Sequence, residues 1–219
     1  MDSNRSQPGT RIPARQLTTM ALLLALGAVL SFIEFPLLPG TDFLKYDAAN
    51  VPALLVGFAY GPLSGCLVAA LIPWLHSLFA GNPWGAVMNM VIGVAYVLPA
   101  SLLFKASRGL GKQARVQLKR TAGFEVSVDR NAGKQQVEVS RQGISGNIAL
   151  IVGLLISCVL AVGTAMVMNY FVTPIYTGAP VQAIVSMMIP ILLPFNILKT
   201  LLNSILGGLL MKSLHSFIK

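Results

Sequence analysis

The chain has 219 residues, of which 55% are hydrophobic and only 11% are charged, and it carries a formal net charge of +9. This composition is typical of membrane proteins and leaves no room for a sizeable soluble domain. The length accommodates about six spanning helices of roughly 20 residues each. We interpret the basic charge as a signal of membrane topology and not as a nucleic-acid-binding surface.

Six apolar stretches, separated by Gly- and Pro-containing turns, predict an all-α integral membrane protein with six transmembrane helices. The first apolar run is too long for a cleaved signal peptide, so we expect it to be a retained helix. The expected spans are 17–35, 47–60, 67–79, which Pro73 interrupts, 84–104, 147–171 and about 192–212, with an outer loop at 36–46, an inner turn at 61–65 and an outer turn at 80–83.

The last apolar segment, Val181 to Leu214, is longer than one span requires. If Lys212 marks the inner interface, a rise of about 1.5 Å per residue across a core of about 30 Å puts the outer boundary near residue 192. We therefore expect Val181 to Ile189 to form a separate outer helix or a cap. By the same rise, Lys199 lies roughly 10 Å below the outer surface.

Lysine and arginine residues gather in the N-terminal tail, in one internal segment and at the end of the chain. By the positive-inside rule, both termini and that segment face the cytoplasm. The alternating runs Phe124–Val128 and Val137–Val139 predict a small basic β-hairpin insertion within it. The expected divisions are a tail at 1–16, transmembrane helices at 17–105, the insertion at 106–146 and the last two spans with the C-terminus at 147–219.

Lys199 lies in an apolar stretch, where a charge costs at least a few kcal/mol unless it faces protein or a polar cavity. Asn196 precedes it by three residues, so both side chains fall on one face of a helix. We interpret the pair as directed inward near the mouth of a cavity. The alternative is a lysine that snorkels to the headgroups.

Other amide, charged and aromatic residues concentrate at the expected outer ends of the spans. This mixture suits a planar ligand with apolar faces and a polar edge. An interfacial aromatic belt and interhelical hydrogen bonds are the alternatives for the aromatic and asparagine residues. The predicted ligand-binding residues are Lys199, Asn196, Asn169, Asn89, Tyr170, Trp84, Phe35 and Asp47.

No motif for catalysis, metal binding or phosphate binding occurs in the sequence, so we predict neither an enzyme nor a cofactor. A chain without an ATP-binding loop requires a partner to drive uphill transport. A different class remains open: a membrane-embedded enzyme that uses His76 with Asp47 or Glu34. The two cysteines lie in apolar runs, and we expect no disulfide.

Small residues at four-residue spacing line one side of the first span, among them Ala21 and Ala25. Such spacing lets another helix approach closely in lipid. The helix that approaches could belong to a partner protein or to this chain.

Several runs resemble the substrate-binding S components of energy-coupling factor transporters. They include Phe32-Ile-Glu34-Phe35-Pro36, Lys45-Tyr46-Asp47-Ala-Ala-Asn50-Val51-Pro52 and Pro194-Phe195-Asn196-Ile197-Leu198-Lys199. The resemblance covers nearly the whole chain apart from the tail and about 106–146, and it is strongest to the riboflavin-specific members.

The resemblance implies a multi-pass protein of the bacterial plasma membrane that captures riboflavin or a related small vitamin from outside. It further implies assembly with a transmembrane T component and two ATPase subunits. Asn169, Asn196 and Lys199 match positions expected to hold the flavin, and Ala21 and Ala25 match the motif that docks the T component. Ile72-Pro73-Trp74 and Asn50 depart from the family pattern, so another vitamin or a flavin nucleotide is the alternative ligand.

Overall fold

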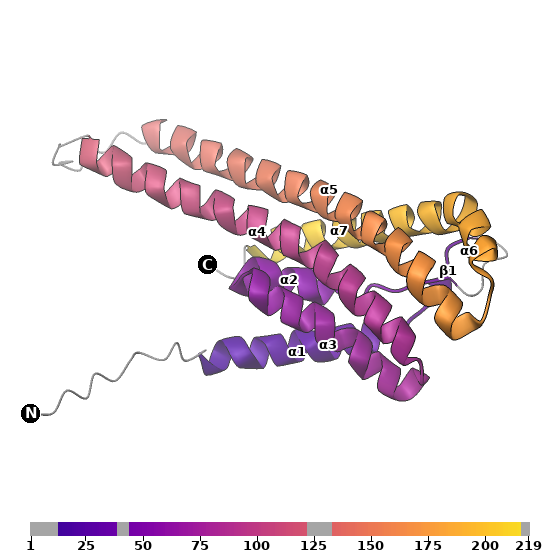
Figure 1. The fold of residues 1–219 in the computed structure, drawn as a ribbon. Coiled ribbons are helices and arrows are strands. Elements are labelled where there is room, and N and C mark those ends of the chain that lie inside the picture. The colour runs from indigo at the N-terminus through magenta and orange to yellow at the C-terminus, as the bar shows by residue number, and fades with distance from the viewer. Residues whose placement is uncertain (1–12, 39–43, 122–132, 216–219) are drawn as a thin grey trace, which may run out of the picture.

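The computed structural model describes residues 13–38, 44–121 and 133–215 of the chain (Figure 1). Almost all of them are helical. The elements are α1 (Ala14–Leu30), β1 (Phe35–Pro36), β2 (Lys45–Tyr46), α2 (Asn50–Tyr60), α3 (Pro62–Ala80), α4 (Pro83–Thr121), α5 (Gly133–Thr177), α6 (Val181–Met187), the π-helix η1 (Met188–Leu192) and α7 (Leu193–His215).

Four helical segments of the described residues are long and apolar enough to cross a membrane. They are Pro62–Ala80, Pro83–Arg108, Ile148–Thr177 and Val181–Ser213. Helices α1 and α2 are apolar but shorter, with 17 and 11 residues. The structure therefore confirms a helical multi-pass membrane architecture, while the count of six spans stays a prediction.

Helix α2 occupies the centre of the bundle and contacts α1, α3, α4 and α7. Every residue from 51 to 58 is buried, so the helix has no face left for lipid. Its close packing depends on glycine: a Cβ at Gly65 of α3 would stand 2.6 Å from the Cα of Gly57. The backbones of α2 and α3 thus touch directly.

The turns between helices contain fewer residues than predicted. The predicted inner turn at 61–65 is reduced to Gly61, whose φ of 104° is accessible to glycine without strain. Pro73 lies inside α3, which continues through it, so the predicted interruption there is wrong. At the opposite turn Gly81 is left-handed, and the Asn82 side chain accepts a hydrogen bond of 2.9 Å from the Gly85 N–H.

The second strand of the predicted β-hairpin is helical in the structure. Val137–Val139 lies within α5, and Phe124–Val128 falls outside the described residues. Three alternating residues are too few to distinguish a strand from a helix. Here α4 and α5 continue beyond their apolar parts as two adjacent helices that project from the bundle (Figure 1).

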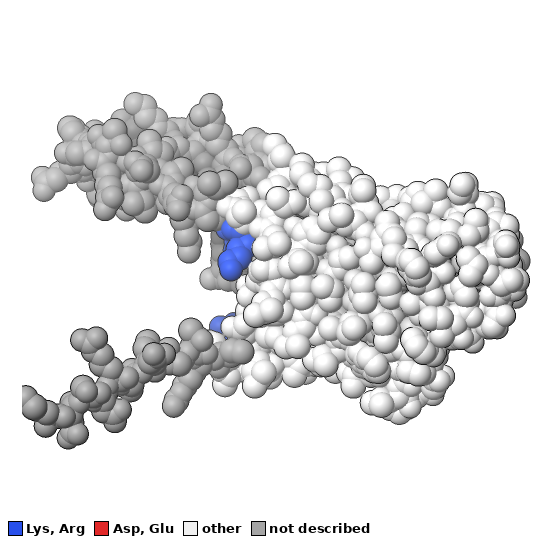
Figure 2. Space-filling view, viewed as in Figure 1, with Lys and Arg blue, Asp and Glu red and all other residues white. Residues whose placement is uncertain are grey.

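The beginning of α1, the end of α7 and the projecting ends of α4 and α5 all lie at one end of the bundle (Figure 1). Figure 2 shows basic side chains at this end and no acidic ones on the face in view. This arrangement agrees with the expectation that the two termini and the basic segment share one side of the membrane. Which side that is stays a prediction.

At the other end, β1 and β2 form a two-stranded antiparallel ribbon in which Phe35 is opposite Tyr46. The predicted first span extends too far, since α1 ends at Leu30 and Phe35 belongs to the ribbon. Asp47 likewise precedes α2 instead of beginning it. The last apolar segment changes helix type near residue 192, as the predicted boundary suggests, but α6 and η1 run into α7 without a break, so a separate outer helix is not shown.

Candidate functional site

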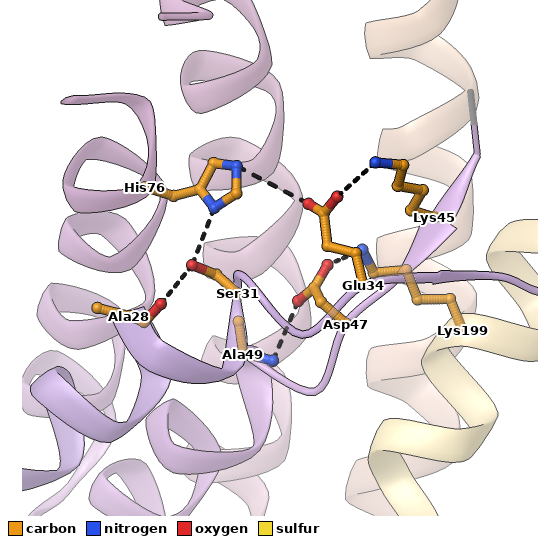
Figure 3. Close-up of polar contacts among 8 residues, drawn as sticks. All are labelled: Ala28, Ser31, Glu34, Lys45, Asp47, Ala49, His76 and Lys199. Atoms are coloured by element: carbon orange, nitrogen blue, oxygen red, sulfur yellow. Dashed lines mark hydrogen bonds and ion pairs between the residues drawn. The ribbon is translucent and has the colours of Figure 1, made fainter. Parts of the chain in front are cut away.

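The strongest polar contact at the ribbon end of the bundle joins α7 to the segment before α2. Lys199 Nζ lies 2.6 Å from Asp47 Oδ2, and the two side chains are only 15% and 17% exposed (Figure 3). The other carboxylate oxygen of Asp47 accepts a hydrogen bond of 3.0 Å from the Ala49 N–H. Asp47 is thus fixed by the backbone at the start of α2 and neutralises the lysine. The prediction that Lys199 faces inward is confirmed.

A second contact lies one helical turn further along α7. The Tyr46 hydroxyl donates a hydrogen bond of 3.0 Å to the side-chain oxygen of Asn203, which is 1% exposed. Burial, followed by the nearby charge of Asp47, raises the pKa of Tyr46 above its usual 10.0. Tyr46, which ends β2, and Asp47, which follows it, therefore contact α7 at two points four residues apart.

Asn196 lies on the same face of α7 as Lys199 and Asn203, as the helical spacing requires. It is buried, and its amide nitrogen donates a hydrogen bond of 2.7 Å to the Leu192 carbonyl in the preceding π-helix. A π-turn displaces carbonyls from their usual partners, and such turns are frequent at functional sites. The amide oxygen of Asn196 can accept a further hydrogen bond.

A second polar cluster lies beside the ribbon and joins the ends of α1 and α3. Glu34 stands between Lys45, at 3.1 Å, and His76, at 3.8 Å (Figure 3). The other ring nitrogen of His76 lies 3.0 Å from the Ser31 hydroxyl. Lys45 is half exposed, so its ion pair is weaker than the buried one. Together the two clusters balance two carboxylates against two lysines.

Four further predicted ligand residues belong to α4 and α5, and the start of α4 and the end of α5 both lie at the ribbon end of the bundle (Figure 1). Asn169 is half-buried on α5, where it donates to the Ala165 carbonyl and accepts from the Thr173 hydroxyl. Tyr170, Trp84 and Asn89 are exposed. Among the described residues, no hydrogen bond or ion pair joins any of these four to Lys199. Their role in binding stays a prediction.

A buried polar layer that the sequence analysis missed lies deeper in the bundle. The Tyr96 hydroxyl lies 2.7 Å from the Ser204 hydroxyl and 3.3 Å from the Thr200 carbonyl. Ser204 also contacts the Cys158 thiol at 3.1 Å. The spacing of Asn196, Thr200, Asn203 and Ser204 along one helix was the available signal, since polar residues recur on that face of α7.

Both residues of the predicted docking motif, Ala21 and Ala25, are exposed on α1. They lie among large exposed side chains, of which Leu22 is 67% and Val29 59% exposed. The alternative to partner docking was that small residues of α1 pack against other helices of this chain. In the structure Gly27 does so, since it is buried against Ile72.

The enzyme alternative finds little support in the geometry. His76 contacts Glu34 but not Asp47, which is paired with Lys199. Within the described residues, no group of three or more histidine, cysteine or acidic side chains could hold a metal ion. Cys66 and Cys158 are both free, as predicted.

These observations define a helical membrane protein with a charged but neutralised polar site at one end of an apolar bundle. The chain belongs to the family described as the substrate-specific component of the ECF transporter, whose model matches residues 15–210. Members of this family are components of transporters and not enzymes.

Two relatives of the chain are named riboflavin transporters. It is 27% identical over 212 residues to the riboflavin transporter RibU of Staphylococcus aureus, which covers 94% of this chain and 93% of that protein. It is 35% identical over 95 residues to the riboflavin transporter FmnP of Bacillus subtilis, across 42% of this chain and 50% of that one.

Solved structures show the same fold. The S component of a bacterial ECF transporter superposes with a TM-score of 0.66 at 28% identity, covering 94% of this chain and 98% of that one. ThiT from Listeria monocytogenes superposes with a TM-score of 0.50 at 18% identity, covering 91% and 94% of the two chains, and shows likeness of fold alone.

Proposed function

We propose that this chain captures riboflavin at the outer face of the bacterial plasma membrane and delivers it as the S component of an ECF importer. The observation that carries the proposal is the neutralised Lys199–Asp47 pair beneath the ribbon, in a chain whose full-length relative is a riboflavin transporter. A vitamin with an amide-like ring edge offers carbonyl oxygens to Lys199. The Asn196 amide oxygen, which accepts no hydrogen bond within the described part of the chain, can bind a ring N–H or a hydroxyl group.

The charge balance favours an uncharged vitamin over a flavin nucleotide. Lys199 is compensated by Asp47, and Lys45 by Glu34, so the described site carries no surplus cation. A phosphate brought into such a site would leave its negative charge without a partner, at considerable cost in free energy. Riboflavin is expected to bind more tightly than its phosphate ester for this reason.

The first experiment is the visible absorption spectrum of protein purified from riboflavin-replete cells, followed by titration of flavin-free protein with riboflavin. Lys199→Met and Asn169→Ala are each expected to weaken binding about tenfold or more, because each removes a polar contact in a desolvated site. Lys105→Met, an exposed lysine of α4 at the opposite end, is the matched control. A preparation that neither contains flavin nor binds it would refute the assignment.

Energy for uphill delivery comes in this proposal from a transmembrane T component and two ATPase subunits, with α1 as the docking surface. Ala25→Leu is expected to leave riboflavin binding intact and to abolish uptake, because a bulky side chain separates the two helices. Gly163→Leu, on the exposed face of α5, adds the same bulk elsewhere and should spare both activities. Uptake that survives Ala25→Leu would disprove the docking assignment.

The same assays separate transport from the enzyme alternative. If His76 acted as a general base, His76→Ala would abolish turnover of a ligand whose affinity is unchanged. In the transport proposal, His76 only supports Glu34 and Ser31, and riboflavin is recovered chemically unaltered after uptake.

A further inference from the structure

A groove runs between α5 and α7 along the surface of their membrane-spanning parts, where the two helices also contact each other. It has a volume of about 270 Å³ and contains none of the predicted ligand residues. Its walls are formed by one stripe from each helix, Leu150, Ile151, Leu154, Leu155 and Cys158 on α5, and Leu201, Ser204, Ile205, Gly208, Leu209 and Lys212 on α7.

Two adjacent glycines explain why α7 packs closely on one side and leaves a hollow on the other. A Cβ at Gly207 would stand 3.0 Å from Leu54 Cδ1, so this glycine lets α7 approach α2. A Cβ at Gly208 would meet Leu154 Cδ1 at 3.5 Å, an ordinary contact. A methyl group is therefore sterically acceptable at Gly208, and the glycine leaves that space in the groove open.

The groove is apolar and open to the side. Ile151, Leu155 and Leu209 are each more than half exposed along it. Ser204 and Cys158 contact each other, and Ser204 also contacts Tyr96, so neither presents an unsatisfied polar group to the groove. Hydrocarbon is the complementary material for such a surface.

One end of the groove carries a positive charge, whereas the rest of its lining is uncharged. Lys212, in the last turn of α7, is the one charged residue among those that line it. The ion pairs of the described residues do not include Lys212. The end of α7 lies at the same end of the bundle as the start of α1 (Figure 1), and Figure 2 shows basic side chains and no acidic ones at that end of the face in view. A phosphate at this position would meet a positive and not a negative surface.

The length of the groove matches one leaflet of a bilayer. From Leu201 to Lys212 the lining stripe of α7 rises about 16 Å, at about 1.5 Å per residue. Half of a hydrocarbon core of about 30 Å is about 15 Å. With its charged end at the interface, the groove reaches from the headgroups to about the middle of the membrane.

We propose that the groove between α5 and α7 binds one acyl chain of an anionic phospholipid, whose phosphate pairs with Lys212. The lateral opening, the leaflet length and the single cation at the interfacial end favour this occupant. A helix of another protein needs no cation at that position, and pairing of two copies of the chain would place two Lys212 side chains at one interface.

Native mass spectrometry tests the proposal on the full chain, extracted from nanodiscs of phosphatidylcholine and phosphatidylglycerol in equal amounts. The wild-type protein is expected to retain one phosphatidylglycerol in preference to phosphatidylcholine. Lys212→Gln should reduce that preference about fivefold, the factor expected for one lysine near an anionic surface. Gly208→Leu, which fills the groove, should remove retention of both lipids.

Two matched variants serve as controls. Lys105→Gln removes a lysine outside the groove at the same end, and Gly163→Leu adds bulk on α5 where no neighbour lies within 4 Å. Both should behave as wild type. Gly208→Ala serves as the filling variant if thermal melting followed by circular dichroism shows that Gly208→Leu does not fold.

Three results would overturn the proposal. Equal retention of the two lipids by the wild type, or unchanged preference in Lys212→Gln, would show that Lys212 does not select the headgroup. Dimers that disappear in Gly208→Leu, without any change in bound lipid, would assign the groove to a second copy of the chain.

Discussion

Separating Lys199 from Asp47 should destabilise the protein more than any other single polar substitution at this end of the bundle. The two charged atoms are 2.6 Å apart, and each side chain is less than one-fifth exposed. Removal of one partner from a buried pair leaves an uncompensated charge, at a cost of about 3–5 kcal/mol. We therefore expect Lys199→Met and Asp47→Asn each to lower the free energy of unfolding by about that amount.

The assay is reversible unfolding in mixed micelles of a mild detergent with dodecyl sulfate, followed by circular dichroism without ligand. The double variant Asp47→Asn/Lys199→Met removes both charges and should be more stable than either single variant. Neighbouring substitutions that share one contact are expected to show a coupling energy of about 0.5–3 kcal/mol. Strictly additive losses, or single losses below about 1 kcal/mol, would show that the pair behaves as a solvated surface contact and refute the argument from burial.

Three further predictions use the same unfolding assay. Gly57→Ala should cost about 1–3 kcal/mol, because its added methyl overlaps the Ser101 hydroxyl, and Ser101→Gly should recover much of that loss. Tyr46→Phe should cost about 1–3 kcal/mol by leaving the buried Asn203 oxygen without its donor. Because burial raises the Tyr46 pKa above 10.0, its contribution is complete below pH 10 and is lost above it, so Tyr46→Phe should flatten the alkaline fall in stability. Lys45→Met should cost less than about 1 kcal/mol, since this lysine is half exposed, and a larger loss would contradict the ranking of the two ion pairs.

Features with a local periodic signal could be predicted from the sequence. A lysine in an apolar stretch must face protein, and the structure places Lys199 against Asp47. The length of the last apolar segment required its division, and α6 with η1 precedes α7 near the expected boundary. In both cases membrane thickness and helix geometry are sufficient to make the inference.

Partners that are distant in sequence could not be predicted in this way. Tyr46 and Asn203 are 157 positions apart, and nothing in either neighbourhood specifies the other. The pairing of Ser31 with His76 is similarly nonlocal, because it depends on how α1 and α3 end relative to each other. The prediction for Val137–Val139 failed for a different reason: these residues are helical, and an alternating pattern this short fits a helix as well as a strand.

The central position of α2 also bears on how the chain enters the membrane during synthesis. Its 11 residues extend only about 16 Å, roughly half the hydrocarbon thickness, so this segment is too short to partition into lipid as an independent unit. All residues from 51 to 58 are enclosed by other helices in the finished protein. Because α1, α3, α4 and α7 together enclose it, α2 is fully shielded from lipid only once all four of these helices have packed around it.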